Sequence, residues 1–292
     1  IGSDFANPII YFENRGSAQC KSTVMLAALN SRGQTIIKAK KSRDHTENIF
    51  KHLGIPIIVK KNKNFDIIKV KGQKDFKSFK YNIPSDPSSC AFFIVLTLLS
   101  KNCELNIKNV NVNPSRIGYI KILNKMGAKI KLKNLKKKYG EMQADIFVKS
   151  QPTLKKINCP PSLNSSLIDE FLIIFLAAAK AKGVSSFSNL GELDKKESPR
   201  LKLGSKLLNQ LGIKTKLIND SIKIYGNPET NLKKKTINIK NYFKDHRIFM
   251  TSVIAAYIFG GVWKINDINS YKSSFPSFLN ILKKLGYKFK LV

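Results

Sequence analysis

The sequence predicts an α/β protein built from one unit that recurs four times along the 292-residue chain. Two observations support this prediction. A Leu-Gly or Met-Gly pair recurs, and each pair follows a run with apolar residues three or four positions apart, which is typical of an amphipathic helix. The pairs end at Gly54, Gly127, Gly212 and Gly286. A glycine just past such a run caps a helix, so each pair marks the same point of one unit.

A second, more apolar helix is predicted upstream of each pair, over residues 17–29, 86–99, 166–181 and 245–259. A strand follows it, such as residues 34–37, and short strands follow each glycine. Once the preceding strand is counted, the unit is βαβαββ with its own small sheet. Helices that are apolar nearly all round are buried, so we expect the first helices to pack together inside a ring of sheets.

The composition favours a soluble protein of one or two globular domains in a reducing cytoplasm. Hydrophobic residues make up 42% of the chain, but the longest apolar runs, 91–99 and 171–179, fall far short of the ~20 residues that span a bilayer. Four Cys and three His are scattered, which predicts no disulfide framework and no metal site. The chain begins with Ile1, without Met or a signal segment, so we expect a piece of a longer protein.

The formal charge of +33 raises the alternative of a non-catalytic, basic nucleic-acid-binding repeat protein. Only six of the 52 basic residues are Arg, whereas nucleic-acid surfaces favour Arg with interleaved aromatic residues. The lysine clusters 136–138 and 233–235 lie between short strand-like runs and are interpreted as solvated turns. We therefore expect no nucleic-acid partner.

Four of the six Arg lie at or near the predicted first turn of a helix: Arg43, Arg116, Arg200 and Arg247. A cation there opposes the helix dipole, at a cost of roughly 0.3–1 kcal/mol each. Helix N-termini bind anions, and Arg adds a bidentate fork, so converging sites of this kind would hold a polyanionic small substrate. The alternative is that nearby acids, namely Asp44, Glu197 and Asp245, neutralise these Arg locally.

Two acidic residues are candidates for proton transfer. Asp169 lies in the first predicted turn of the most apolar helix, where partial burial would suit it to proton abstraction. The simpler interpretation is an acid that stabilises the helix dipole. Glu197 lies between Lys196 and Arg200, which taken alone indicates an ordinary surface ion pair.

At these residues the chain resembles the enolpyruvyl transferases, and specifically the 5-enolpyruvylshikimate-3-phosphate synthases of the bacterial type that carries Ser-Ala-Gln. Several motifs in one order carry the resemblance, which is more specific than any motif alone. They are residues 17–22 (SAQCKS), 42–47 (SRDHTE), 86–89 (DPSS), 168–170 (IDE), 196–200 (KESPR), 245–247 (DHR) and 274–276 (SFP).

The resemblance implies a fold and a reaction. The fold is an inside-out α/β barrel, with βαβαββ units around buried helices. The reaction transfers the enolpyruvyl group of phosphoenolpyruvate to the 5-hydroxyl of shikimate 3-phosphate and releases phosphate, in chorismate and aromatic amino acid biosynthesis. No cofactor is implied, and we expect a monomer.

The resemblance also implies residue roles. Shikimate 3-phosphate would contact Ser17, Ala18, Gln19, Arg43, Asp169 and Lys196, and phosphoenolpyruvate would contact Gln19, Arg200 and Arg247. Asp169 would be the base on the attacking hydroxyl, and Glu197 would move the proton at the methylene carbon. Arg116 matches a family position, but the resemblance does not tie it to either substrate. Pro199 stands where the family commonly has Asp, but Pro suits a first helical turn.

Two domains are expected from the resemblance. Residues 1–84 would be the last unit of a truncated first domain, and residues 85–292 a second domain of three units, two of whose strands come from an upstream segment. The family's opening Lys-Ser and Arg, and its Gly-rich loop, would also lie upstream. The UDP-N-acetylglucosamine enolpyruvyl transferases, which share fold and donor, remain an alternative.

We therefore predict that the 292-residue chain alone does not turn over, because half of the expected cleft lies upstream of Ile1. Phosphate release from phosphoenolpyruvate and shikimate 3-phosphate measures this directly. Release above the rate without protein would contradict the prediction.

Overall fold

The computed structural model describes residues 6–72, 75, 78–151 and 153–291, so Ile1 to Asp4 and Val292 lie outside the described part. The chain divides into two compact units, which are described separately here. Unit 1 comprises residues 1–85, 108–117 and 133–145, and unit 2 comprises residues 86–107, 118–132 and 146–292. The expected domain boundary after residue 84 stays a prediction.

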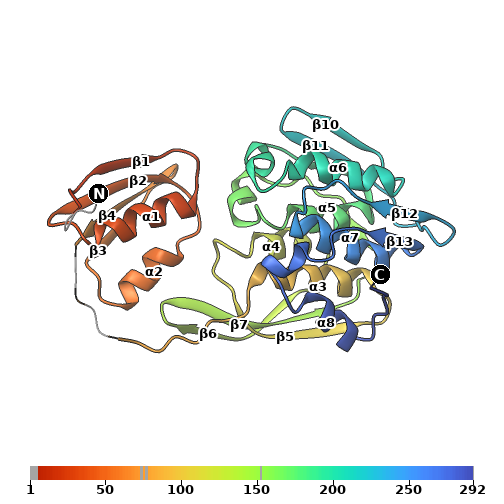
Figure 1. Ribbon diagram of the computed structural model, residues 1–292, viewed down its shortest axis with the longest axis horizontal. Helices are drawn as coiled ribbons and strands as arrows, with labels where there is room; N and C mark the ends of the chain where they lie inside the picture. The colour runs from red at the N-terminus through yellow and green to blue at the C-terminus, as the bar shows by residue number, and fades with distance from the viewer. Residues whose placement is uncertain (1–5, 73–74, 76–77, 152, 292) are drawn as a thin grey trace. The chain divides into compact units, whose positions relative to one another are not determined.

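Unit 1 contains one complete copy of the predicted unit (Figure 1). Its elements are β1 (Ile10–Glu13), α1 (Ala18–Ala28), β2 (Gln34–Lys40), α2 (His45–His52), β3 (Ile57–Lys61) and β4 (Phe65–Lys71). The sheet has the order β1-β2-β4-β3, in which β1 and β2 are parallel and the other pairs are antiparallel. Both helices cover the sheet, whose inner residues, such as Ile37 and Ile68, are fully buried.

Unit 2 contains a second complete copy with the same topology. Its elements are β8 (Leu154–Lys155), η1 (Pro161–Ser166), α5 (Phe171–Ala179), β9 (Ala181–Phe187), η2 (Gly191–Lys195), α6 (Arg200–Gln210), β10 (Thr215–Ile218) and β11 (Ser221–Gly226). The strand order β10-β11-β9-β8 is that of the first copy, again with its first two strands parallel. The predicted βαβαββ unit is therefore confirmed.

The remaining two copies are shorter variants of the unit. One has α3 (Pro87–Leu99), β5 (Glu104–Asn111), α4 (Gly118–Lys125), β6 (Lys131–Lys138) and β7 (Glu141–Lys149). The other has β12 (Thr236–Ile239), α7 (His246–Phe259), β13 (Val262–Ile265), η3 (Ser270–Ser273) and α8 (Phe278–Lys284). The first forms the sheet β5-β7-β6, with a single parallel bridge from Ser85 to Val110 in place of its first strand, and the second forms the parallel pair β12-β13.

The first helices of the three copies in unit 2 form its core. Helices α3, α5 and α7 pack against one another, and every residue of α5 is buried (Figure 1). The prediction is wrong for α1, in which only Lys21, Met25 and Ala28 are buried and Leu26 is 57% exposed. Within unit 1, α1 packs on one sheet only, through strands β1, β2 and β4.

Each repeated glycine ends a helix in the predicted way. Gly54, Gly127, Gly212 and Gly286 all have positive φ, between 71° and 98°. The next residue donates its N–H to the carbonyl five positions earlier, as Ile213 does to Leu208 at 3.0 Å. This is a Schellman motif. It requires a residue in the left-handed backbone conformation, which Gly adopts with the least strain.

Two local predictions need correction. Helix α5 begins at Phe171 rather than at Ser166, because residues 161–166 form a 3-10 helix and residues 168–170 form a turn. Lys136 and Lys137 are exposed and Lys138 is half-buried, but all three belong to strand β6 rather than to a turn. Strand β6 lies at an edge of its sheet, where Lys side chains keep other strands from pairing. Among the described residues, no helix is both long and apolar enough to cross a membrane.

The packing of β11 on α5 generates a stability prediction. A Cβ on Gly226 would lie 2.2 Å from the carbonyl oxygen of Ala181 and 2.3 Å from that of Ala178, and neither backbone oxygen can move freely. Gly226→Ala should therefore lower the free energy of unfolding by at least about 1–3 kcal/mol, measured by urea denaturation.

Gly191→Ala is the matched control. Its Cβ would meet only the Asp220 side chain at ordinary contact distance, so the change should stay within about 0.5 kcal/mol. Equal losses in the two variants would contradict this account of the packing.

Candidate functional site

Arg200 is the first residue of α6 and the centre of a charged cluster in unit 2. Its side chain is only 1% exposed, which is rare for Arg unless the charge is paired. Its Nε donates to Asp245 Oδ2 at 2.9 Å, its Nη1 lies 3.4 Å from Asp169 Oδ1, and its Nη2 lies 2.5 Å from Glu197 Oε2. The guanidinium therefore joins carboxylates from three segments that are distant in the sequence.

Asp245 connects Arg200 to the start of α7. Its Oδ1 caps the helix by accepting the backbone N–H of Arg247 at 2.8 Å, while its Oδ2 accepts from Ser198 Oγ at 2.7 Å and from Arg200. Burial raises the pKa of Asp245, but the charge of Arg200 and these hydrogen bonds outweigh burial and hold the pKa below its ordinary value. Asp245 therefore remains ionised and fixes the starts of α6 and α7 together.

Asp169 lies in the turn before α5, where three cations face its carboxylate. Lys196 Nζ lies 3.7 Å away, Arg200 Nη1 3.4 Å and Arg247 Nη2 3.9 Å. The structure thus brings together the residues that the sequence places at the starts of three different helices. The Asp169 carboxylate thus lies among cations from the starts of α6 and α7 and from the segment before α6.

Arg247 is less completely paired than Arg200. Its Nε is buried and, within the described ranges, has no hydrogen-bond partner. Glu197, on the other side of the cluster, is 59% exposed and its ion pair with Arg200 faces solvent. An anion that reaches this cluster would find Arg247 only partly paired, and it would compete with the exposed Glu197 carboxylate for Arg200.

The local-neutralisation hypothesis is correct for Arg200, which contacts both Glu197 and Asp245. Asp44 forms an ion pair with Lys61, at 3.2 Å. The two hypotheses are compatible, because the acids balance the cations while the exposed Glu197 leaves them accessible.

In unit 1, the predicted acceptor residues Ser17, Ala18 and Gln19 open helix α1. Ser17 is the N-cap, and its Oγ accepts the backbone N–H of Cys20 at 3.3 Å. The preceding loop is held by the buried carboxylate of Glu13, whose Oε2 accepts the backbone N–H of Gly16 at 2.6 Å and of Ser17 at 3.0 Å. The first turn of α1 thus presents backbone N–H groups that can bind an anion.

Arg43 lies two residues before α2 and adjacent to the start of α1. Its carbonyl accepts from Lys21 Nζ at 2.8 Å, and Lys21 forms an ion pair with Glu47 in the first turn of α2. In the sequence, Lys21 and Glu47 stand out only as members of the motifs 17–22 and 42–47. The ion pair between them could not be predicted, because the sequence does not show which charged side chains are buried.

Arg116 belongs to a separate polar network around Glu141. Glu141 is buried, and its carboxylate contacts His45 Nδ1 at 2.8 Å and accepts from Asn48 at 3.2 Å and from Asn113 at 3.0 Å. Arg116 Nη1 lies 3.4 Å from His45 Nε2. Burial raises the pKa of Glu141, but the contact with His45 and the amide hydrogen bonds outweigh it and lower the pKa. Sequence reasoning did not identify Glu141 at all.

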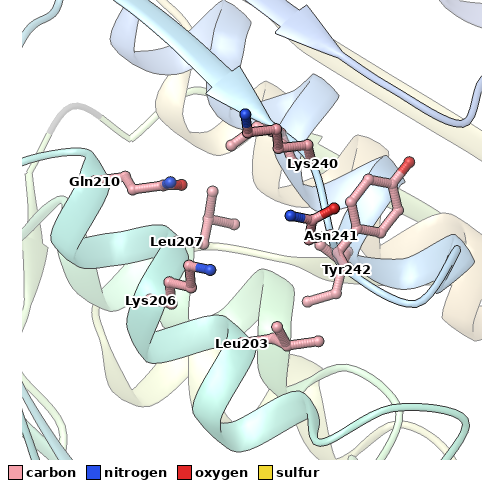
Figure 2. Close-up of a pocket in the computed structure, with 9 residues that line it drawn as sticks. Leu203, Lys206, Leu207, Gln210, Lys240, Asn241 and Tyr242 are labelled. Carbon is pink, nitrogen blue, oxygen red and sulfur yellow. The ribbon is translucent and has the colours of Figure 1, made fainter.

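The predicted site residues therefore form two groups. Unit 1 holds Ser17, Ala18, Gln19 and Arg43, and unit 2 holds Asp169, Lys196, Glu197, Arg200 and Arg247. Figure 2 shows a different hollow in unit 2, between α6 and the segment after β12. It holds about 20 Å³, which is room for roughly one water molecule and not for a substrate. No group of three or more potential metal ligands occurs in the described ranges.

Comparisons with known proteins agree with these motifs. The family model described as EPSP synthase (3-phosphoshikimate 1-carboxyvinyltransferase) matches residues 6–282. Two curated relatives, both named 3-phosphoshikimate 1-carboxyvinyltransferase, come from Ruthia magnifica and Zymomonas mobilis. The first is 39% identical over all of this chain and 65% of its own length, and the second 37% identical over 98% and 63%. This chain thus spans about two thirds of their length.

Solved structures show the same relationship. An EPSP synthase from Acinetobacter baumannii superposes with a TM-score of 0.84 at 32% identity, covering 96% of this chain and 63% of that one. The enolpyruvyl transferase NikO from Streptomyces tendae has a TM-score of 0.73 at 13% identity, with 98% and 65% covered. The second match shows the fold alone, and together the matches confirm the predicted fold class.

The central role of Asp245 generates a stability prediction. Asp245→Ala leaves the buried Arg200 without its main partner and should lower the free energy of unfolding by about 3–5 kcal/mol. The pKa of Asp245 lies below its ordinary value of 3.8, so its contribution is complete above that pH and is lost as pH falls through the lowered pKa. Urea denaturation across this acidic range should show that loss in the parent chain and not in the variant.

Ser198→Ala is the control, because it removes one hydrogen bond to the same carboxylate and leaves Arg200 paired. It should cost about 1 kcal/mol. An Asp245→Ala variant no less stable than Ser198→Ala would refute the assignment.

Proposed function

The chain belongs to the EPSP synthase family, and from this premise we propose that the protein transfers the enolpyruvyl group of phosphoenolpyruvate to the 5-hydroxyl of shikimate 3-phosphate. The products are 5-enolpyruvylshikimate 3-phosphate and phosphate. The observation that carries the proposal is the convergence of Lys196, Arg200 and Arg247 on Asp169. Such a cluster matches the needs of a reaction between two polyanions, one of which must lose a proton.

The donor would bind to the two arginines. Arg200 is held by Asp245 and would bind the donor after Glu197 is displaced, and Arg247 has a buried Nε without a hydrogen-bond partner among the described residues. Family membership implies a further donor contact from Gln19. Fixed cations around the developing charge of the tetrahedral intermediate would supply much of the rate enhancement, since they need no rearrangement during the reaction.

For the acceptor, we propose the residue roles that family membership implies. Ser17 and Ala18, with Gln19 and Arg43, offer the helix N-terminus and a cation, which suit the 3-phosphate. Lys196 would contact the ring hydroxyls. Asp169 would take the proton of the 5-hydroxyl as that oxygen attacks the donor, the role that family membership implies for a carboxylate placed among these cations.

The proton at the methylene carbon would pass through Glu197. Its exposed carboxylate is paired with Arg200 in the free chain, so donor binding at Arg200 would release it toward the reacting carbon. The rest of the proposal is a monomer in the cytoplasm that uses no metal, no organic cofactor and no nucleic acid. Free thiols at Cys20, Cys90, Cys103 and Cys159 are compatible with a reducing compartment.

Donor binding tests the proposal. In titration calorimetry on the chain saturated with shikimate 3-phosphate, Arg247→Lys should weaken phosphoenolpyruvate binding by roughly 10-fold or more, because Lys keeps the charge and loses the fork. Arg32→Lys is the control, since Arg32 is exposed and outside the site, and it should bind as the parent chain does. Equal affinities for the parent and Arg247→Lys would overturn the role of Arg247.

The acceptor is tested by thermal unfolding of the whole protein. Shikimate 3-phosphate should stabilise it against heat, and UDP-N-acetylglucosamine should not. Stabilisation by the nucleotide sugar instead would favour the related transferase. No binding of shikimate 3-phosphate by the whole protein would overturn the proposed function.

A further inference from the structure

Lys21 and Glu47 form an ion pair inside unit 1 that the proposed chemistry does not use. The Lys21 side chain is 1% exposed and that of Glu47 is 3% exposed, and Lys21 Nζ lies 2.5 Å from Glu47 Oε1. Lys and Glu are almost never buried this completely. Removing both charges from water costs several kcal/mol per ion, so a buried pair of this kind is weak evidence for a purely stabilising role.

The contacts of Lys21 point to a different role. Its ammonium group also donates to the carbonyl oxygen of Arg43 at 2.8 Å. One Lys side chain from α1 thus holds both the backbone just before α2 and a side chain in the first turn of α2. The hydroxyls of Ser22 and Thr46, 2.6 Å apart, form a second connection between the same segments.

Both connected segments carry residues of the proposed acceptor site. Ser17, Ala18 and Gln19 open α1 within one turn of Lys21, and Arg43 supplies the carbonyl that Lys21 binds. A bidentate or charge-assisted contact to phosphate depends on geometry, and displacement of a positioning group by about 1 Å is enough to lose most of its effect. The position of Arg43 relative to the first turn of α1 should therefore determine how well the two together bind phosphate.

We propose that Lys21 and Glu47 are a positioning pair, which sets Arg43 against the N-terminus of α1 so that both grip the phosphate group of the acceptor. Glu47 orients the ammonium group, and Lys21 fixes the Arg43 backbone through its carbonyl. Neither side chain touches the substrate. This inference rests on the proposed function, because it assumes that the acceptor carries a phosphate at this site.

The decisive variant replaces the pair by apolar residues of similar size, Lys21→Met with Glu47→Leu. Single variants leave one buried charge alone and should lower the Tm strongly, whereas the double variant should recover most of the loss because neither charge remains. The Arg43 carbonyl, however, still lacks its donor in the double variant. If the pair positions Arg43, the double variant should regain most of its Tm but should still bind phosphate more weakly than the parent chain.

Calorimetric titration at 25 °C with shikimate 3-phosphate and with shikimate gives the readout. The parent chain should bind the phosphorylated ligand more tightly. In the folded double variant, the Kd for shikimate 3-phosphate should rise roughly 10-fold, as expected for a lost charge-assisted contact, while the Kd for shikimate changes little. The ratio of the two constants isolates phosphate recognition, which a purely structural pair would leave unchanged.

Lys149→Met with Glu104→Leu is the matched control. This exposed Lys–Glu pair in unit 2, with 3.1 Å between Nζ and Oε2, should change neither Tm nor either Kd appreciably. If the first double variant does not fold at 25 °C, Glu47→Gln serves in its place, because the amide oxygen still accepts from Lys21 but no longer balances its charge. It should show a smaller shift of the ratio in the same direction.

The outcomes separate the two hypotheses. A folded pair variant that discriminates the two ligands as well as the parent chain does would overturn the positioning role. A parent chain that binds shikimate 3-phosphate no better than shikimate would instead overturn the proposed function. Loss of discrimination in the pair variant, with the control unchanged, supports the positioning role.

Discussion

The burial of three apolar helices is the constraint on which unit 2 depends. Helices α3, α5 and α7 have almost no polar face, so they exclude water only by packing against one another inside their sheets. That packing fixes where each helix begins. Arg200 at the start of α6 and Arg247 in α7 come within 4 Å of the Asp169 carboxylate, which precedes α5, because these helices pack against one another.

Electrostatic interactions then determine which residues are stable at those helix starts. An arginine in a first turn is repelled by the positive end of the helix dipole, and carboxylates from neighbouring segments offset this repulsion. Asp245 does so by capping α7 while it accepts a hydrogen bond from Arg200. The result is a nearly balanced cluster in which Glu197 is exposed and Arg247 Nε lacks a hydrogen-bond partner among the described residues. Unit 1 uses the same principle, with Lys21 and Glu47 joining two helix starts.

Predictions from sequence failed where a property depended on neighbours. Helix α1 is not buried all round, since it packs on a single sheet, and α5 begins five residues late because residues 161–170 form a 3-10 helix and a turn. Glu141 escaped notice entirely. Its importance comes from amides of α2 and of the β5–α4 connection, and no local pattern marks a carboxylate that such partners surround.

The sequence by itself determined the repeated βαβαββ unit, the Schellman glycines and the motifs that identify the family, because these depend on periodicity, local backbone conformation and residue order. Only the tertiary structure decided which charges are buried and which carboxylate pairs with which cation. Lys21 and Lys149 are equivalent letters in the sequence, yet one is enclosed and the other is in water. Burial and pairing are properties of the packed chain, since they are set by residues far away in the sequence.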